Sequence, residues 1–419
     1  MLKAVINRLR RAMPGRRVQV GRRSEDRRLT GRVVVATRLY APEPTPAAFR
    51  HEALVDELRR RGHRVRVLTS SLPRSVPVQD DSDVSRWPVL RDSQGHVKGY
   101  ASYMSFDIPL ILRLLAVRSP RVFVVEPPPT TGFAVMLVSL IRRVPYVYYA
   151  ADVWADASRT LQGVPGIVPA VLGIVERMVW RRAALILAIS PGVQQRIHEL
   201  IGQRSAIAMV GNGIRMNGYT IEGPERGSAG SPRFIYAGTV SEWHGAGIFI
   251  DAFMAVVAKH PHARLIFFSE GAHKSALEQK VARAGIAGVE FHSRVPTEEL
   301  SRHLRSAVAS LASVAPGQGY DFAIPTKIYA STASGTPVIY AGTGPSVGMV
   351  QDGGLGWAVD YTTDAVAEAM LMAIAARADG TAPSPSTLRE WTAEHASLEA
   401  SAAQIVDLLE AVERGDAAS

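Results

Sequence analysis

Short runs of apolar residues alternate along the chain with segments whose apolar residues recur at helical spacing. The first run is Val33–Ala36, and a helical pattern follows from about residue 47 to Arg61, where Gly62 ends it. An uninterrupted apolar run is typical of a parallel strand buried on both faces, because crossover helices cover both faces of a parallel sheet. Runs of the same kind lie at 64–69, 122–125, 146–149 and 185–188. This alternation predicts a doubly wound α/β sheet.

The same alternation begins again after residues 216–232, a stretch of Gly, Pro, Ser and Thr that we interpret as a linker. The strands expected in the second series are 234–238, 264–268, 289–291, 309–311 and 337–340. We therefore predict two Rossmann-like domains, residues 31–215 and 233–390, that face a cleft. Ligands of such open sheets bind at the carboxyl ends of the strands. A helix in the last segment, 391–419, is expected to return to the first domain.

Positive charge is concentrated near the amino terminus. The net charge is +10, and residues 1–32 hold eleven Lys or Arg against two acidic residues, so the rest of the chain is almost neutral. Residues 2–13 place apolar side chains on one helical stripe and basic side chains on the other, which suits the surface of an anionic membrane. A disordered leader and a nucleic-acid arm are the alternatives for this tail, residues 1–30. We expect a membrane surface as its partner and no nucleic acid.

Several kinds of chemistry are excluded by what the sequence lacks. With no Cys there is no disulfide, no thiolate nucleophile and no Cys-ligated metal. The sequence has no P-loop and no G-x-G-x-x-G motif. Asp81-Ser82-Asp83 has the form of a metal-binding D-x-D, but it lies in a polar segment where we expect solvated side chains and no metal. No apolar run reaches the ~18 residues that a membrane span needs.

The most informative segment is residues 319–344, GYDFAIPTKIYASTASGTPVIYAGTG. It resembles the signature of the family-4 retaining glycosyltransferases of the GT-B fold, in which a Lys precedes an Ala-x-Gly-x-Pro-Val-Ile sequence. The matching residues are Lys327, Gly335, Pro337 and Val338. Weaker matches follow in the family's order along residues 31–413, at 40–43, 61–65, 103–106, 127–128, 151–154, 188–193, 211–213, 236–238 and 294–296. The chain is most similar to the subgroup that builds bacterial surface polysaccharides by moving N-acetylated amino sugars to lipid-linked acceptors.

The resemblance implies a metal-independent enzyme that takes its sugar from a nucleotide-diphosphate sugar, with UDP as the expected nucleotide and no further cofactor. As the sugar leaves, negative charge grows on the diphosphate, and a cation with backbone N–H groups at a helix N-terminus stabilises it. Lys327, at the start of a helical stretch, is the predicted catalytic cation. The other predicted donor-binding residues are Gly238, Thr239, His244, Arg294, Asp321, Gly342 and Gly344.

Asp152 is the predicted catalytic residue of the first domain. It follows the apolar run 146–149 and so stands at the carboxyl end of an expected strand. The resemblance implies a polar active-site residue here, which would bind sugar hydroxyls or orient the acceptor, whereas a helix N-cap is the structural alternative. Glu43 and Trp154 are predicted to line the same acceptor side, although a Trp is often only a packing residue.

The sequence departs from the family at several donor-site positions. The family's Glu-x7-Glu pair, which contacts the donor sugar and the ribose, falls on Phe322 and Ala330, and Asp321 is the carboxylate next to the first position. The Arg and Lys that often hold the diphosphate fall on Thr239 and His244. His244 replaces the lysine only if it is protonated or acts as a neutral donor.

We therefore predict a retaining glycosyltransferase of hexosyl or N-acetylhexosaminyl type that serves cell-surface polysaccharide synthesis. It would use a lipid-linked or glycan acceptor and work in the cytoplasm, peripheral on the inner membrane face. The alternative is a catalytically silent GT-B scaffold that partners an active glycosyltransferase. A GT-B sugar-nucleotide epimerase is disfavoured, because the acid–base carboxylates and histidines it needs are not found together.

Overall fold

A computed structural model describes most of the chain from residue 31 onward. The described residues are 31–43, 45–73, 81–92, 97, 99–159, 167–203, 206–223, 231–271, 273–318, 320–321 and 323–414. The predicted tail, residues 1–30, lies outside them, as does part of the predicted linker, 224–230. The chain forms two compact units: residues 1–212 with 401–419 make unit 1, and residues 213–400 make unit 2.

Unit 1 is built on a seven-stranded parallel sheet with the order β3-β2-β1-β4-β5-β6-β7. Its strands are β1 (Arg32–Ala36), β2 (Arg64–Ser70), β3 (Val84–Trp87), β4 (Pro120–Val125), β5 (Tyr146–Ala150), β6 (Leu185–Ala188) and β7 (Ile207–Met209). Every strand expected from an apolar run is present. The order reverses beside β1, which is the topological switch point of a doubly wound sheet.

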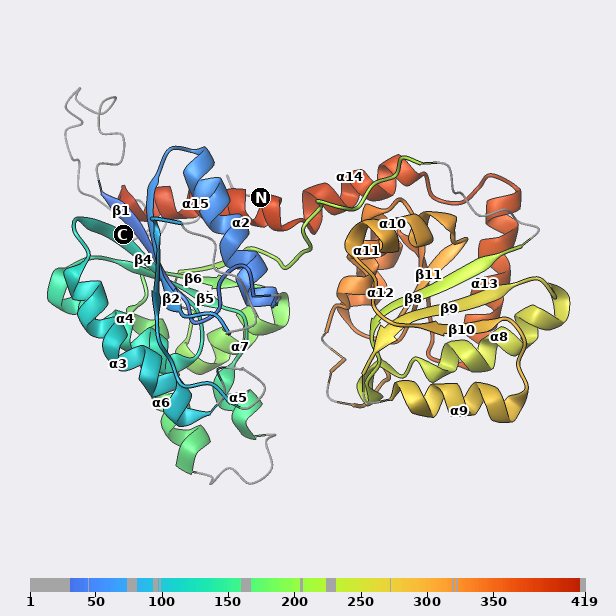
Figure 1. Ribbon diagram of the computed structural model, residues 1–419, viewed down its shortest axis with the longest axis horizontal. Helices are drawn as coiled ribbons and strands as arrows, with labels where there is room; N and C mark the ends of the chain where they lie inside the picture. Colours follow the sequence, from blue (N-terminus) through green and yellow to red (C-terminus); the bar gives the residue numbers. More distant parts are fainter. Residues whose placement is uncertain are drawn as a thin grey trace. The chain divides into compact units, whose positions relative to one another are not determined.

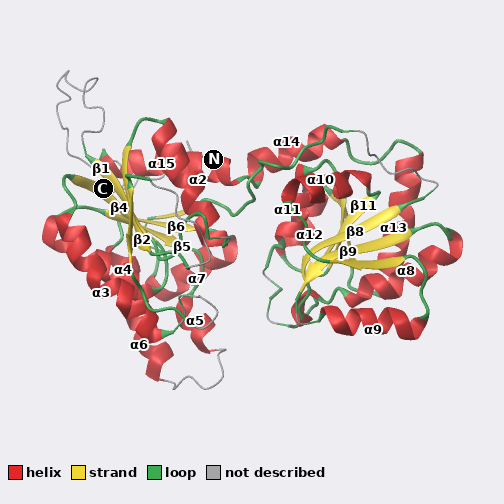
Figure 2. Cartoon of the chain, in the orientation of Figure 1, coloured by secondary structure: helices red, strands yellow, loops and turns green. Residues whose placement is uncertain are grey.

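Helices cover both faces of this sheet (Figures 1 and 2). Apolar side chains of α2 (Pro46–Arg60) and α15 (Leu398–Glu413) pack on one face. Those of α3 (Tyr100–Ala116), α4 (Pro129–Arg142), α6 (Ile167–Arg182) and α7 (Pro191–Ile201) pack on the other, and α5 (Trp154–Arg159) packs against α6. Each strand-to-strand crossover is right-handed. The crossover helices therefore lie on one face of the sheet where successive strands are added in one direction, and on the other face where they are added in the opposite direction.

The last helix, α15, packs against unit 1 through polar contacts as well as through its apolar side chains. Arg61 donates to Asp407 at 2.5 Å and to the carbonyl of Ala403 at 3.0 Å. His63 lies 3.1 Å from a carboxylate oxygen of Glu410. The apolar side of the helix meets the sheet through Ile405, Val406, Leu409 and Val412.

Unit 2 repeats the same plan with six parallel strands in the order β10-β9-β8-β11-β12-β13. The strands are β8 (Arg233–Thr239), β9 (Arg264–Glu270), β10 (Val289–His292), β11 (Ala309–Ser313), β12 (Val338–Ala341) and β13 (Gly356–Val359). On one face lie α8 (Gly247–Lys259), α9 (Lys274–Ala284) and α13 (Thr363–Ala378). On the other lie α10 (Thr297–Ser306), α11 (Thr326–Ala333), α12 (Pro345–Asp352) and α14 (Pro385–His395). The predicted fold class, two doubly wound α/β domains, is confirmed.

Two distant segments of unit 2 pair at its boundary. Ile214 forms a parallel bridge with Ser397, and the N–H of Leu398 donates to the carbonyl of Ile214 at 2.9 Å. A Cβ on Gly213 would come within 2.3 Å of the carbonyl oxygen of Ala396, so only Gly fits this approach. Among the described helices, none has the length and apolar character to cross a bilayer.

Candidate functional site

In unit 2 the predicted donor residues gather at the carboxyl ends of β8, β11 and β12. Gly238 and Thr239 end β8, and a 3₁₀ turn at Glu242–His244 follows directly. Lys327 is the second residue of α11, which Pro325 precedes at the N-cap position. Ile328, Tyr329 and Ala333 anchor α11 in the core, so the helix is held deep in the unit and Lys327 is buried with it.

Lys327 is a buried cation that pairs with no carboxylate of the described residues. Its side chain is wrapped by β8: Nζ lies 5.0 Å from the ring centroid of Tyr236, and a Cβ added to Gly238 would stand 3.4 Å from Nζ. Gly238 has a φ of 121°, which also favours Gly there. Burial, together with the positive charge of Arg294, lowers the pKa of Lys327 to about 8. Within the described part of the chain, Lys327 makes no hydrogen bond or ion pair.

His244 stands beside Lys327 and is neutral. Burial lowers its pKa to about 3, with a further contribution from the charge of Lys327. Its Nδ1 lies 2.5 Å from the hydroxyl of Ser241, and its ring stacks on Trp243 at a centroid distance of 3.6 Å. A pKa lowered in this way favours the second of the two alternatives that the sequence left for His244, a neutral hydrogen-bond donor. Trp243 also stacks on Tyr320, at 4.8 Å.

Arg294 and Thr239 are exposed at the same edge. Arg294 lies in the loop between β10 and α10, near enough to influence the pKa of Lys327. Thr239 uses its carbonyl to accept from the hydroxyl of Tyr236 at 3.0 Å. Two cations, Lys327 and Arg294, act on one another at this edge and suit an anionic ligand, and Glu270 ends β9 at the same edge.

Asp321 ties together two loops at this edge. Its Oδ1 accepts from the N–H of Gly317 at 3.2 Å and from the hydroxyl of Thr343 at 3.0 Å. The second contact fixes the loop after β12, in which Gly342 and Gly344 lie and from which α12 begins. At Gly342, with φ 155°, a Cβ would come within 2.6 Å of the carbonyl oxygen of Val314.

Of the two residues that replace the carboxylates of the Glu-x7-Glu pattern, only Ala330 lies within the described residues. Phe322 lies outside the described residues. Ala330 is buried in a small apolar cluster of unit 2 with Ile235 and Leu304. The second carboxylate of the pattern is therefore missing from a dry position on the inner side of α11.

In unit 1, polar residues gather at the carboxyl ends of β1, β4 and β5. Thr37 directly follows β1, and Glu126 directly follows β4. The hydroxyl of Thr37 donates to Glu126 Oε1 at 2.6 Å. Glu126 Oε2 faces Arg50 at 3.7 Å and His51 at 3.5 Å, both on α2. Asp152, two residues after β5, lies near enough to this group for its charges to act on it: partial desolvation raises the pKa of Asp152, Arg50 lowers it and Glu126 raises it. We call these residues, Thr37, Arg50, His51, Glu126 and Asp152, the unit 1 polar cluster.

A second buried pair adjoins this cluster. Arg38 lies over the ring of Tyr103 at 3.9 Å, and its Nε and Nη1 find no hydrogen-bond partner among the described residues. Burial lowers its pKa, opposed by the charges of Asp107 and Glu126. Asp107 accepts from the hydroxyl of Thr131 at 2.6 Å, and burial raises its pKa. Buried charges with incomplete partners are typical of sites that a ligand completes.

Asp152 does not cap α5, the helix that follows it. The N–H groups of Trp154 and Ala155 donate instead to Glu176, at 2.8 and 3.1 Å. The structural alternative for Asp152 is therefore wrong. Asp152 is exposed and forms no hydrogen bond within the described residues. Trp154 meets Tyr103 edge to face at 5.9 Å, so it packs beside the site while remaining partly exposed.

Glu43, the third residue predicted on the acceptor side, has a partner. Both of its oxygens accept from Arg91, at 3.0 and 3.3 Å, and its side chain is buried. Arg91 also donates to the hydroxyl of Ser70 at 3.1 Å. Glu43 thereby fixes the loop between β1 and α2, and its carboxylate is not free in this structure.

Both carboxylates of the D-x-D sequence, Asp81 and Asp83, pair with the side chain of an arginine. Arg59 donates to Asp81 at 2.7 Å and to Asp83 at 3.2 Å. Among the described residues no group of three His, Asp or Glu side chains is placed to hold a metal ion.

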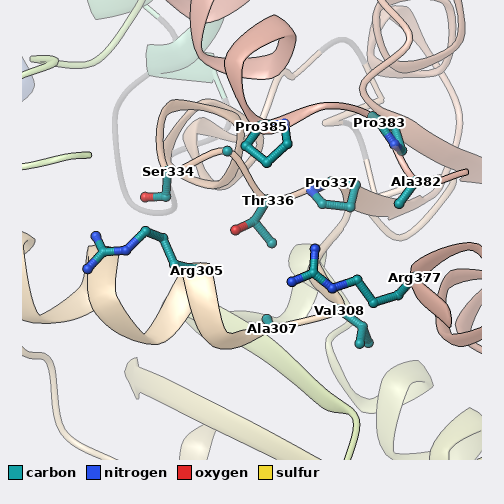
Figure 3. Close-up of a pocket in the computed structure, with 11 residues that line it drawn as sticks. Arg305, Ala307, Val308, Ser334, Thr336, Pro337, Arg377, Ala382, Pro383 and Pro385 are labelled. Carbon is teal, nitrogen blue, oxygen red and sulfur yellow. The ribbon is translucent and has the colours of Figure 1, made fainter. Parts of the chain in front are cut away.

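One small cavity of unit 2 is unrelated to this site. It is lined by Arg305 and Arg377 with residues of the turns before β11 and β12, and its volume is about 10 Å³ (Figure 3). That is roughly the space of one water molecule. The cavity lies at the amino ends of the strands, whereas Lys327 and its neighbours lie at the carboxyl ends.

Two Rossmann-like units with one strand order, each with polar residues at its carboxyl edge, are the architecture of the GT-B glycosyltransferases. Residues 47–213 match the Glycosyl transferase 4-like domain, and residues 231–376 match the Glycosyl transferases group 1 domain. The chain is therefore a glycosyltransferase of the GT-B class. No curated protein matches it at a significant level.

Solved structures share this fold at low sequence identity. Sucrose-phosphate synthase from Thermosynechococcus elongatus has a TM-score of 0.68 and 14% identity, with 92% of this chain and 100% of that chain covered. Anabaena HepE in complex with UDP has a TM-score of 0.64 and 16% identity, with 91% and 100% covered. A glycosyltransferase from Rickettsia africae has a TM-score of 0.65 and 9% identity, with 91% and 98% covered.

Sequence reasoning missed most of the unit 1 polar cluster. Glu126 had a signal, since it stands directly after the apolar run 122–125 and before Pro127-Pro128. Arg50 and His51 had none, because they occur within an ordinary amphipathic helix. They meet Glu126 only once α2 has packed on the sheet.

Proposed function

We propose that the chain is a retaining, metal-independent glycosyltransferase that moves a hexosyl or N-acetylhexosaminyl group from a nucleoside-diphosphate sugar to a lipid-linked or glycan acceptor. Lys327 is the observation that carries this proposal. It is a buried cation with no carboxylate partner in the described structure, held against the backbone of Gly238 at the start of α11. A buried charge without a partner is unfavourable, so the site is suited to a ligand that brings negative charge.

The diphosphate of a nucleotide sugar supplies that charge. Charge on the leaving diphosphate grows as the bond to the sugar breaks, so a fixed cation and the amino end of α11 stabilise the transition state more than the ground state. Neutral His244 adds a donor and Arg294 adds a second cation at the same edge. Anabaena HepE, with the same fold, is described in complex with UDP and with UDP-glucose, which supports UDP as the nucleotide.

The unit 1 polar cluster is the proposed acceptor side. Asp152 is exposed and its pKa is raised, so its carboxyl can meet an incoming hydroxyl, while Glu126 is held between Thr37 and Arg50. The Nε and Nη1 groups of Arg38, which have no hydrogen-bond partner among the described residues, can donate to oxygen atoms of the acceptor substrate. Retention of configuration and a role in cell-surface polysaccharide synthesis are supported by the motif around Lys327. The basic tail, residues 1–30, supports a place in the cytoplasm on the inner membrane face.

Calorimetric titration with UDP, GDP and dTDP tests the donor site. We expect one of the three, UDP, to bind the full chain, and Lys327→Met to weaken that binding at least about tenfold because it removes the charge and keeps the buried stem. Lys280→Met is the matched control, since Lys280 is already paired with Asp251 at 2.6 Å. Binding unchanged in Lys327→Met, or absent for all three nucleotides, would contradict the proposal.

A second function, a catalytically silent scaffold for an active glycosyltransferase, is favoured by Ala330. A family position that carries a carboxylate is here a buried alanine, so a ribose loses one hydrogen-bond partner. The scaffold predicts that none of the three nucleotides binds. Nucleotide binding that depends on Lys327 would count against it.

A further inference from the structure

Exposed apolar side chains gather on three helices of unit 1. Eighteen large apolar side chains are exposed in the described part of the chain, and eleven of them lie on α3, α4 and α6. These are Tyr100, Ile108, Leu112, Leu115, Phe133, Leu137, Leu140, Ile141, Ile167, Val171 and Ile174. Soluble proteins rarely expose apolar side chains in such groups without a partner for them.

The eleven side chains form one surface. The helices α3, α4 and α6 lie in one layer, with α4 in contact with both of the others (Figure 1). Their inner sides pack on one face of the sheet, so their outer sides face away from it together. The exposed residues recur three or four positions apart, as Ile108, Leu112 and Leu115 do on α3, which places them along one outer stripe of each helix. We call this surface the three-helix face.

The charges of the three-helix face have one sign. Asp107 and Glu176 are the acidic residues of these helices, and both are buried. Exposed arginines stand at the carboxyl-terminal ends, at Arg143 after α4 and at Arg181 and Arg182 in α6. Basic residues at helix ends also suit the helix dipole. The dipole does not explain why three long exposed helix faces carry no carboxylate.

A cavity lined by arginines opens beside the end of α3. Its volume is about 430 Å³, and Arg32, Arg66, Arg113 and Arg118 line it with no acidic residue. Arg113 donates to the hydroxyl of Ser85 at 3.1 Å, and it forms no ion pair with a carboxylate in the described part of the chain. A space lined by arginines and by no acidic residue is complementary in charge to a phosphate group.

We propose that the three-helix face docks on an anionic lipid bilayer, with its apolar side chains in the interface and its arginines against lipid phosphates. Charge complementarity is the reason for choosing this partner: an apolar face with exposed arginines and no exposed carboxylate matches a layer of anionic headgroups over acyl chains. The inference deepens the membrane location in the proposed function, but it does not depend on sugar transfer. It gives the chain a membrane surface separate from its tail.

Flotation of the full chain with vesicles tests this surface. The vesicles contain phosphatidylcholine alone or phosphatidylcholine with phosphatidylglycerol. We expect binding to the anionic vesicles and a fall of about tenfold or more in the triple variant Leu112→Gln, Leu140→Gln, Val171→Gln, which places one amide on each helix. A second triple variant, Arg143→Gln, Arg181→Gln, Arg182→Gln, is expected to lose about fivefold for each arginine.

The control variant removes a comparable number of exposed apolar side chains, but it removes them from unit 2. Met254→Gln with Met372→Gln changes two exposed side chains of unit 2 and is expected to float like the parent chain. Every variant retains residues 1–30, so a loss in the helix variants reports on the helices. UDP calorimetry on the same samples shows whether unit 2 is intact, which separates a failure here from a failure of the donor site.

Two results would overturn the inference. In one, the leucine and valine variant floats as well as the parent chain, which assigns membrane binding to the tail. In the other, that variant turns a dimer into a monomer in light scattering and leaves flotation unchanged, which assigns the three-helix face to a second copy of the chain.

Discussion

At the scale of single residues, the donor site depends on a charge held at an energetic cost. A pKa of about 8 for Lys327, in place of 10.5, corresponds to about 3 kcal/mol of destabilisation while the lysine is charged and the site is empty. A bound diphosphate removes most of this cost, because it supplies the missing partner. The same residue thus links folding, binding and leaving-group stabilisation.

This charge makes a prediction about pH. The pKa of Lys327 lies below the unfolded value, so the folded lysine loses its proton as the pH rises through about 8. UDP affinity is therefore expected to fall above pH 8 by up to about tenfold for each pH unit. Calorimetry at a series of pH values measures it. In Lys327→Met the profile should be flat, and an equal fall in that variant would show that another group is titrating.

Lys327 could be predicted from sequence, but the state of its neighbours could not. The motif places a lysine at the start of a helix, which is local information. The neutrality of His244 comes from burial beside Lys327, which depends on how β8 and α11 pack. The Arg50 and Glu126 contact has the same origin, since these residues are far apart in the sequence and only the tertiary fold joins them.

At the scale of elements, strands were predictable where burial made them uniformly apolar. The strands β1, β5, β8 and β12 are such cases. The edge strands β3 and β7 were not predicted, because none of their residues is fully buried. The sequence of β3 also mixes polar and apolar side chains, and β7 is only three residues long. Helix α5 was also not predicted. The carboxylate that caps its amino end belongs to Glu176, which lies on the following helix, α6.

That cap makes the stability of unit 1 depend on pH. Burial raises the pKa of Glu176 to about 7, above its ordinary 4.5. The folded chain therefore holds this proton more tightly than the unfolded chain, so stability falls as the pH rises from 4.5 to 7, by up to about 3 kcal/mol. Glu176→Gln, which carries no titrating proton, should lose this slope in urea unfolding between pH 5 and 7.5.

Glu199→Gln is the control for the cap, because Glu199 is exposed and paired with Arg196. It should keep the slope of the parent chain. A slope that persists in Glu176→Gln would mean that a group other than Glu176 titrates in this range.

At the scale of the whole molecule, charge is divided between a basic tail and a nearly neutral remainder. Deletion of residues 1–30 removes most of the net charge and leaves both sheets untouched. We expect weaker flotation with phosphatidylglycerol vesicles, a smaller dependence of flotation on salt, and unchanged UDP binding. Flotation that does not change after the deletion would leave the tail without a role at the membrane.

The parallel direction of α3, α4 and α6 has a kinetic consequence. Helices that join parallel strands all run the same way, so their amino ends, which carry no charged side chain, lie at the edge of the sheet with Asp152 and Glu126. A bilayer resting on these helices would bring this edge down to the lipid surface, and acceptors would arrive by two-dimensional diffusion. Turnover would then follow the mole fraction of acceptor lipid in the membrane and would fall on surface dilution with inert lipid, even at constant bulk concentration.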